Sequence, residues 1–222
     1  MTVGDTVFRR IPGEGWLVLV GSTPELGGET ADLMERLLQR LDLSRPIAAI
    51  AAPDSDPEAI NEFLESLEEW LGTEAGLLEL QGDLDVEGWD ESGLLVLEGH
   101  DGEIWVEALQ GEAGEKLRRS FDRGAVILAI GGAASAFGAQ VVSAVRPDTL
   151  SAGLAWIPEA IVVVDPEEAY ADVVRAWLRQ SPRRLVLRLE PASILALGPE
   201  QQVERWSQAS PEIVLGPGWE SA

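Results

Sequence analysis

The sequence is poor in the residues that most often carry reactive chemistry. It has no cysteine, which excludes disulfides, cysteine-ligated metal sites and a cysteine nucleophile. Its single histidine, His100, excludes metal sites built from several histidines and leaves one imidazole that could act as a base. It also has no apolar run approaching the roughly 18–20 residues that a membrane-spanning helix needs. The available chemistry is therefore that of hydroxyl, carboxylate and backbone groups around one histidine.

Positive charge is scarce as well. Lysine and arginine together number 16 against 39 acidic residues, so the formal net charge is −23. A surface this acidic repels phosphate backbones and anionic lipid headgroups, and we expect neither nucleic acid nor a membrane as partner. The acidic excess is typical of a well-solvated surface, and a cationic partner is the alternative. Residues 1–15 contain no apolar segment of the kind found in signal peptides, so a cytoplasmic location is expected.

Apolar and amphipathic segments alternate along the 222 residues. Short apolar runs predict strands, and apolar residues at helical spacing predict helices between them. Such alternation over short connections forms parallel βαβ units, so we expect an α/β fold: a three-layer α/β/α sandwich with a mainly parallel central sheet. No repeat or linker divides residues 1–222, which are interpreted as one domain. The predicted strands are 16–20, 47–52, 76–80, 94–97, 125–130 and 161–164, and the predicted helices are 33–41, 57–71, 104–109, 112–122 and 166–179.

The arrangement of the strands can be predicted in part for the N-terminal portion of the chain. We expect the strands at 16–20, 47–52, 94–97 and 125–130 to be adjacent and parallel in one sheet. Towards the C-terminus the pattern is less regular. Short strands at 185–189, 194–197 and 212–215 are expected to be antiparallel.

Segment 125–130 and the small residues after it are the most informative stretch. An apolar run of this kind is typical of a central strand buried on both faces. Gly131, Gly132, Ala133 and Ala134 then allow a sharp turn and a closely packed helix. A turn at the carboxyl end of a central strand is where open α/β sheets bind ligands and where nucleophile elbows present a serine or cysteine. The tip of this turn is Gly131, so a nucleophile is missing there.

Residues 16–198 resemble the peptidase S51 family, which includes dipeptidase E and cyanophycinase within the class I glutamine-amidotransferase-like fold. The resemblance depends on the turn and on the loops Val20-Gly-Ser-Thr-Pro-Glu-Leu-Gly-Gly-Glu29, Ala51-Ala-Pro-Asp-Ser55 and Leu97-Glu-Gly-His-Asp-Gly102. The family pattern Arg-Gly-Gly-Val-Ile-Ala-Gly-Thr-Ser-Ala-Gly-Ala, laid on residues 123–134, puts its nucleophilic serine on Gly131. The segment that resembles the donor of the catalytic histidine falls near residues 164–167, which contain no histidine.

The resemblance therefore implies a scaffold that has lost its peptidase chemistry. A glycine has no side chain with which to attack a carbonyl, and no second histidine replaces the missing base. We interpret the chain as a non-catalytic relative of the S51 peptidases, a binding or regulatory protein with no cofactor and no metal. The resemblance implies a small peptide or an amino-acid-like molecule as ligand, and a homodimer.

The candidate binding residues come from two loops expected to border one crevice: Gly99, His100 and Asp101 after one strand, and Gly131 and Gly132 after the next. Backbone N–H groups at such a turn attract carboxylate or phosphate. If Gly131 lies at the tip of an elbow, its φ and ψ should fall in a region strained for other residues.

Two alternatives remain open at the level of sequence. One is a serine hydrolase with a rearranged site, in which Ser135 is the nucleophile and His100 the base. The other is a purely structural subunit of a larger complex. Several carboxylates could also gather at the crevice as an acidic rim or a cation site, although no spacing resembles a known metal loop. They are Glu98, Asp101, Glu103, Glu167 and Glu190.

Tryptophan is abundant, with eight residues. Trp105, Trp156 and Trp177 lie in apolar patterns and are predicted to be in the core. Trp206 and Trp219 lie in polar contexts, and we expect them to be exposed and available for an interface.

Overall fold

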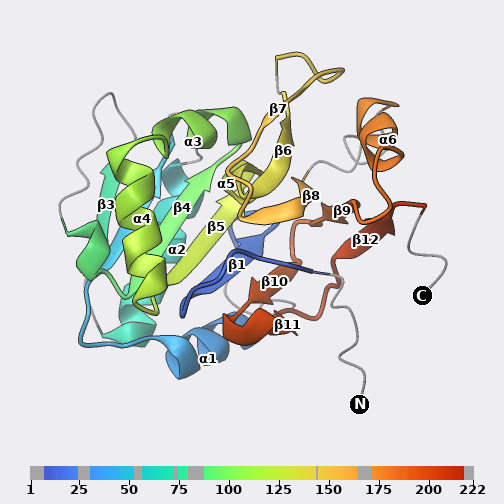
Figure 1. Cartoon of the computed structure of the whole chain (residues 1–222). Helices are drawn as coiled ribbons and strands as arrows, with labels where there is room; N and C mark the ends of the chain where they lie inside the picture. The colour runs from blue at the N-terminus through green and yellow to red at the C-terminus, as the bar shows by residue number, and fades with distance from the viewer. Residues whose placement is uncertain are drawn as a thin grey trace.

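The computed structural model of the chain describes residues 8–24, 31–52, 57–72, 75–79, 88–143, 145–164 and 172–217. These residues form two β-sheets with helices packed around them (Figure 1). The central sheet has seven strands in the order β11-β10-β1-β5-β4-β2-β3. Its strands are β1 (Trp16–Val20), β2 (Ile47–Ala51), β3 (Ala75–Glu79), β4 (Leu94–Gly99), β5 (Val126–Gly131), β10 (Ile194–Leu197) and β11 (Val203–Arg205).

Four strands in the middle of this sheet are parallel neighbours. β5 pairs with β1 on one side and with β4 on the other, and β4 pairs with β2. In this register Ile127 lies between Leu17 and Leu95. Every residue of β1, β4 and β5 is buried, which explains why their sequences are continuous apolar runs rather than alternating ones. The predicted adjacency and direction of these four strands are confirmed.

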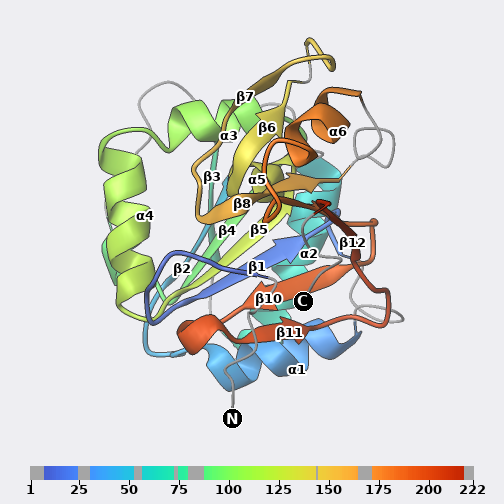
Figure 2. The same cartoon turned by 45° about the vertical axis from the view of Figure 1, so that its right-hand side comes forward.

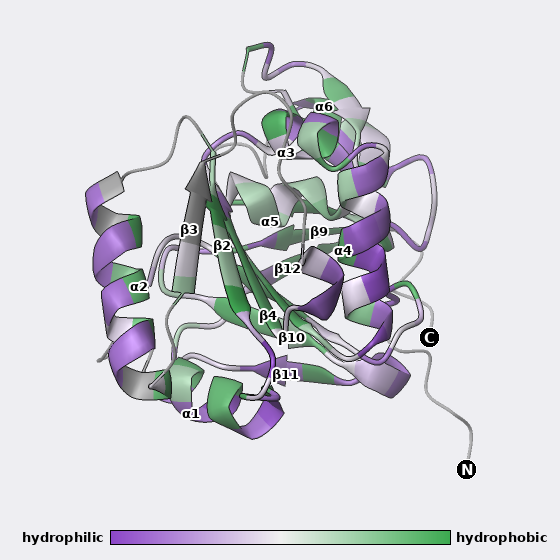
Figure 3. Cartoon of the chain, turned by 90° about the vertical axis from the view of Figure 1, so that its left-hand side faces the viewer, coloured by the Kyte–Doolittle hydropathy of each residue, from purple (hydrophilic) through white to green (hydrophobic). Residues whose placement is uncertain are grey.

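Helices cover both faces of the parallel strands, as Figure 3 shows. On one face, α1 (Ala31–Arg40) and α2 (Pro57–Leu71) bury apolar side chains such as Leu37 and Leu67 against the sheet. On the other face lie α3 (Gly102–Ala108) and α4 (Glu112–Asp122), which bury Trp105 and Phe121. The predicted three-layer α/β/α arrangement is confirmed. In the described ranges, no helix has both the length and the apolar composition to cross a membrane.

A second sheet, which the sequence did not predict, extends the α3/α4 side of the molecule. Its inner face packs Val162 and Leu187 into the same core as Leu19 of the central sheet. Its outer face is covered by α6 (Asp172–Leu178), which contributes Val174 and Trp177. The strand order is β12-β9-β8-β6-β7. The strands are β6 (Gly138–Val142), β7 (Leu150–Ala152), β8 (Ile157–Val163), β9 (Leu185–Arg188) and β12 (Glu212–Leu215).

The C-terminal strands are antiparallel in most of their pairings. β10 runs antiparallel to β1, with Leu197 opposite Leu17, and β12 runs antiparallel to β9. The prediction for these strands is confirmed, except that β9 is also parallel to β8 on its other side. The helix predicted at 166–179 is present as α6, and its first residues, 166–171, lie outside the described residues.

The prediction for Trp206 was wrong, because this residue is completely buried. Its ring centroid lies 5.6 Å from that of Trp16. Its Nε1 donates a hydrogen bond of 2.8 Å to Glu204 Oε2, so the polar atom of the indole is satisfied inside the protein. Trp105, Trp156 and Trp177 are buried as predicted, and Trp219 lies outside the described residues.

Glu204 also connects β11 to α1. Its Oε1 accepts a 2.9 Å hydrogen bond from Arg40 Nη2, and the Arg40 guanidinium lies 4.8 Å from the centroid of the Trp16 ring. Burial raises the pKa of Glu204, but the hydrogen bonds from Trp206 and Arg40 outweigh burial and hold it below the ordinary value of 4.5. The ionised form of Glu204 therefore stabilises the fold.

Replacing this carboxylate should have a pH-dependent effect. We expect Glu204→Gln to lower the free energy of unfolding by roughly 1 kcal/mol at neutral pH, since the group is partly exposed and its ion pair is partly screened. A carboxylate with a depressed pKa stabilises above its unfolded-state pKa, and this contribution disappears as the pH falls through the folded-state pKa. The difference between wild type and variant, measured by urea unfolding, should therefore shrink below pH 4.5. A difference that stays constant from about pH 7 to 3 would contradict this assignment.

Candidate functional site

Gly131 lies where the sequence predicts an elbow, at the carboxyl end of β5. Its φ of 63° and ψ of −132° belong to a region that residues with a side chain adopt only under strain. The expectation for its dihedral angles is confirmed. α5 (Gly132–Ala136) begins at the next residue and has only five residues before the chain enters β6. Because so short a helix has a small dipole, binding here would depend on local backbone groups.

The loop after β4 packs directly on this turn. Gly99 and Gly131 are register partners in the parallel pair β4–β5. A Cβ on Gly131 would lie 2.8 Å from the carbonyl oxygen of Gly99, and a Cβ on Gly132 would overlap the carbonyl group of His100. The structure thus brings together Gly99, His100, Asp101, Gly131 and Gly132, which we call the elbow site. Its two central glycines are required by the close approach of two backbone segments.

Ser135 has a structural environment. Its side chain is buried, and its Oγ donates a 2.7 Å hydrogen bond to the carbonyl oxygen of Gly132. A Cβ on Gly102 would overlap this Oγ, so the hydroxyl is enclosed where α3 and α5 meet. A hydroxyl has one proton to donate, and here a backbone carbonyl accepts it. In this structure the Ser135 hydroxyl is therefore directed to a backbone carbonyl rather than to a histidine.

The other polar residues of the elbow site differ in their roles. His100 is exposed in the loop between β4 and α3. Asp101 is the N-cap residue of α3, and its Oδ1 accepts a 2.8 Å hydrogen bond from the backbone N–H of Glu103. Asp101 is therefore explained by helix capping. The sequence contained this signal, because an aspartate directly before an amphipathic helical pattern is a typical cap.

The carboxylates that could have gathered beside the elbow have separate surroundings. Glu98 is buried at the end of β4, on the face that it shares with Val96. Glu190 is exposed and lies 3.3 Å from Arg188, and Glu167 lies outside the described residues. In the part of the chain that the structure describes, no group of three or more histidine, aspartate or glutamate side chains could hold a metal ion.

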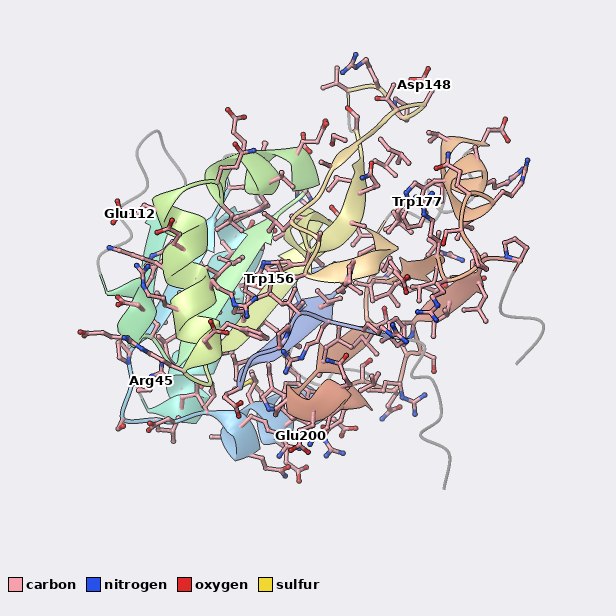
Figure 4. The ribbon with its side chains drawn as sticks, viewed as in Figure 1. Arg45, Glu112, Asp148, Trp156, Trp177 and Glu200 are labelled. Carbon is pink, nitrogen blue, oxygen red and sulfur yellow. The ribbon has the colours of Figure 1, made fainter. Side chains whose placement is uncertain are left out.

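Glu103 connects α3 to the β6–β7 hairpin, a contact that no sequence pattern predicted. Its Oε2 accepts a 2.6 Å hydrogen bond from Ser143 Oγ. This bond is the main cause that lowers the pKa of Glu103 below its ordinary value, so the carboxylate is ionised at neutral pH. The link fixes the hairpin beside the elbow site, while Asp148 lies at the outer end of the hairpin (Figure 4).

An aromatic cluster packs at the end of α5, next to the elbow site. Trp156 packs against Phe121 of α4, with ring centroids 4.9 Å apart, and against Phe137, which follows α5, at 5.1 Å. Figure 4 shows Trp156 between α4 and the second sheet. These three rings hold the end of α5 in place.

No protein-family model and no curated protein matches this chain. A solved structure described as a peptidase from an acI-B1 Actinobacterium has a similar fold, with a TM-score of 0.66. The similarity covers 92% of this chain and 95% of that chain, at 14% sequence identity. The chain therefore has a peptidase-like α/β fold with a mostly parallel central sheet.

Proposed function

We propose that this peptidase-like scaffold is a non-catalytic relative of the S51 serine peptidases, the group of dipeptidase E and cyanophycinase. In this proposal it acts as a binding or regulatory protein through the elbow site. The observation that carries the proposal is Gly131. It lies at the tip of a strand-to-helix turn, with dihedral angles that are strained for residues with a side chain. A nucleophile elbow presents its reactive side chain at this point, and glycine has none to present.

The space around Gly131 also supports a non-catalytic site. A serine there would place its Cβ 2.8 Å from the carbonyl oxygen of Gly99, so the β4–α3 loop would have to move to admit one. The nearby hydroxyl, on Ser135, is already bonded to the Gly132 carbonyl. Without a nucleophile, backbone donors and binding could supply only a small residual rate.

The groups that the elbow site offers to a ligand are mainly hydrogen-bond donors. In this proposal the donors are backbone N–H groups of the β4–α3 loop and of the turn, beside the exposed His100. Donors of this kind match a carboxylate, which accepts several hydrogen bonds at once. A small peptide or an amino-acid-like molecule is therefore the ligand class that we propose.

The chemical half of the proposal can be tested with a fluorophosphonate probe, which labels activated serines. We expect no serine of the wild-type chain to be labelled, and no change in Ser135→Ala. Ser120→Ala is a matched control, because Ser120 is also buried and its Oγ donates to a backbone carbonyl, that of Ser92. Labelling that is lost in Ser135→Ala and kept in Ser120→Ala would favour the rearranged hydrolase instead.

The binding half can be tested by amide chemical shifts during titration with an Asp-Leu dipeptide and with β-Asp-Arg. We expect the amide signals of Gly99, His100 and Gly132 to shift, while those of Gly88 and Gly114 stay unchanged. Weak sites have dissociation constants near ~1 mM, so a titration to roughly 10 mM is sufficient. Unchanged signals at the elbow site with both dipeptides would contradict a peptide-binding role.

A further inference from the structure

The negative charge of this protein is confined to one part of the chain. Residues 172–222 contain six arginines and six acidic residues and are neutral, so residues 1–171 carry the whole net charge of −23. The described elements of the neutral part include α6, β9 and β12, which lie together on one side of the molecule in Figure 1. Figure 2 shows α6 and β12 from a second direction. The residues concerned are Arg175, Arg179, Arg183, Arg184, Arg188 and Arg205, and Asp172, Glu190, Glu200, Glu204, Glu212 and Glu220.

β12 is the last strand of the second sheet and has one open edge. It pairs antiparallel with β9, with Val214 opposite Val186, and Gly216 N donates to Arg184 O at 2.8 Å. Alternate residues of an antiparallel strand turn their backbone groups to opposite sides. Ile213 and Leu215 therefore direct their N–H and C=O groups away from β9. Within the described ranges, no strand pairs with this side of β12.

The side chains of the same two residues are exposed. Ile213 is 40% and Leu215 44% exposed, and with Val203 of β11 they make up half of the six exposed large apolar residues among those described. Proteins usually protect an open edge with lysine, proline or a bulge, and β12 has none of these. Its one charged residue, Glu212, is bound by Arg188 at 2.6 Å.

We propose that β12 pairs with β12 of a second copy of this chain about a twofold axis, which joins the two five-stranded sheets. In the favoured register, Val214 lies on the axis and Ile213 lies opposite Leu215 of the partner subunit. In this register, the outward-facing N–H and C=O groups of Ile213 and Leu215 in each strand form hydrogen bonds with the partner subunit. It also places Glu212 opposite Gly216 of the partner subunit, so the two glutamates do not face each other.

The distribution of charge favours pairing of two copies at β12 over pairing at the other edge strands of the two sheets. Two copies of a chain with a charge of −23 repel each other, and they approach most easily through the neutral side that holds β12. By contrast, the edge strands β3 and β7 belong to the acidic part of the chain. At the open edge of β11, the outward-facing residues are Val203 and the charged Arg205, since Glu204 is opposite Ala196 between them. This inference does not depend on the proposed function.

Cross-linking tests the register directly, because the chain has no cysteine of its own. Residues opposite each other in a non-hydrogen-bonded antiparallel pair have Cα atoms about 4.5 Å apart, which a disulfide can span. We expect Val214→Cys to form a covalent dimer on mild oxidation. Leu215→Cys, whose neighbour across the axis is Ile213 of the partner subunit, should cross-link at least about tenfold more slowly. Equal cross-linking of the two variants, or none, would overturn the register.

Sedimentation of the full chain tests the dimer itself. We expect wild type to be dimeric and to dissociate less as salt rises from about 0.05 to 0.5 M, because salt screens the repulsion between two acidic subunits. Ile213→Lys should be monomeric, since it adds a charge to the pairing edge. Leu43→Lys is the control and should stay dimeric, because Leu43 is 47% exposed and lies outside any strand. A monomeric wild type at roughly 100 μM, or a dimer that persists in Ile213→Lys, would overturn the proposal.

Discussion

Gly132→Ala is expected to lower the free energy of unfolding by about 3–5 kcal/mol, enough to prevent folding if the chain has ordinary stability. The added Cβ would overlap the carbonyl group of His100 and lie 2.6 Å from the backbone N of Asp101. These are backbone atoms, so no side-chain rotation can relieve the contact. The β4–α3 loop or the turn itself would have to move, which would break the pairing between Gly99 and Gly131.

Gly76→Ala in β3 is the matched control for this variant. A Cβ there meets no atom within 4 Å, so the change should alter the unfolding free energy by less than about 0.5 kcal/mol. Urea and thermal unfolding of both variants measure the contrast. If Gly132→Ala were as stable as Gly76→Ala, the two backbone segments could not lie as close as the structure places them.

The second large effect is expected at Arg10, which joins the N-terminal segment to the end of β10. The side chain is only 6% exposed. Its Nε donates to the carbonyl oxygen of Gly198 at 2.6 Å, and its terminal nitrogens donate to those of Ile11 and Gly13 at 2.8 and 2.9 Å. The guanidinium also lies 4.8 Å from the centroid of the Phe121 ring. Burial is the main cause that lowers the pKa of Arg10, but neutral backbone carbonyls and an aromatic face still solvate the cation.

We expect Arg10→Met to cost about 3–5 kcal/mol, because several buried carbonyls would lose their donor at once. Arg10→Lys should fall between wild type and Arg10→Met, since an ammonium group cannot reach carbonyls that are arranged around a planar fork. The control is Arg183→Met, in which an exposed arginine loses its charge without loss of a buried contact. Unfolding free energies rank the three variants, and equal values for Arg10→Met and Arg183→Met would refute the role of Arg10.

The parallel strands could be predicted from sequence because strands buried on both faces consist mostly of apolar residues. β1 and β5 have no polar side chain, β4 has only Glu98, and each apolar run ends within two residues of the strand that the structure shows. Their parallel direction and their place in one sheet followed from the alternation of strands and helices, whereas the order β1-β5-β4-β2 was not predicted.

The second sheet could not be predicted for a physical reason. Its strand β7 has three residues, and β6 reads Gly-Ala-Gln-Val-Val, so neither is long or regular enough to show a period. These strands are stabilised by tertiary contacts, such as those of Val141 with Gly102 and of Trp156 with Phe121. Trp206 was misjudged for a related reason, since its burial depends on a hydrogen bond to Glu204 that no local pattern reveals.

The backbone conformation of the elbow site could be predicted from the sequence, but the roles of its side chains could not. The run of small residues was enough to predict the turn at Gly131 and its strained dihedral angles. The role of Ser135 depends on which acceptor its hydroxyl meets, and sequence spacing leaves the Gly132 carbonyl and a histidine equally open. The separate surroundings of the carboxylates likewise depend on distant partners, such as Ser143 for Glu103.

The position of β1 has a consequence for biosynthesis. It leaves the ribosome well before both of its neighbours, yet it lies inside the sheet, with Leu17 between Ile127 of β5 and Leu197 of β10. Translation adds about 5–20 residues per second, so β1 waits on the order of ten seconds for its last neighbour. A nascent chain that reaches only residue 190 has β5 beside β1 but leaves the other edge of β1 open to strands of other chains. The species most open to pairing with other chains is therefore one in which β1 and β5 have emerged and residues 194–197 have not.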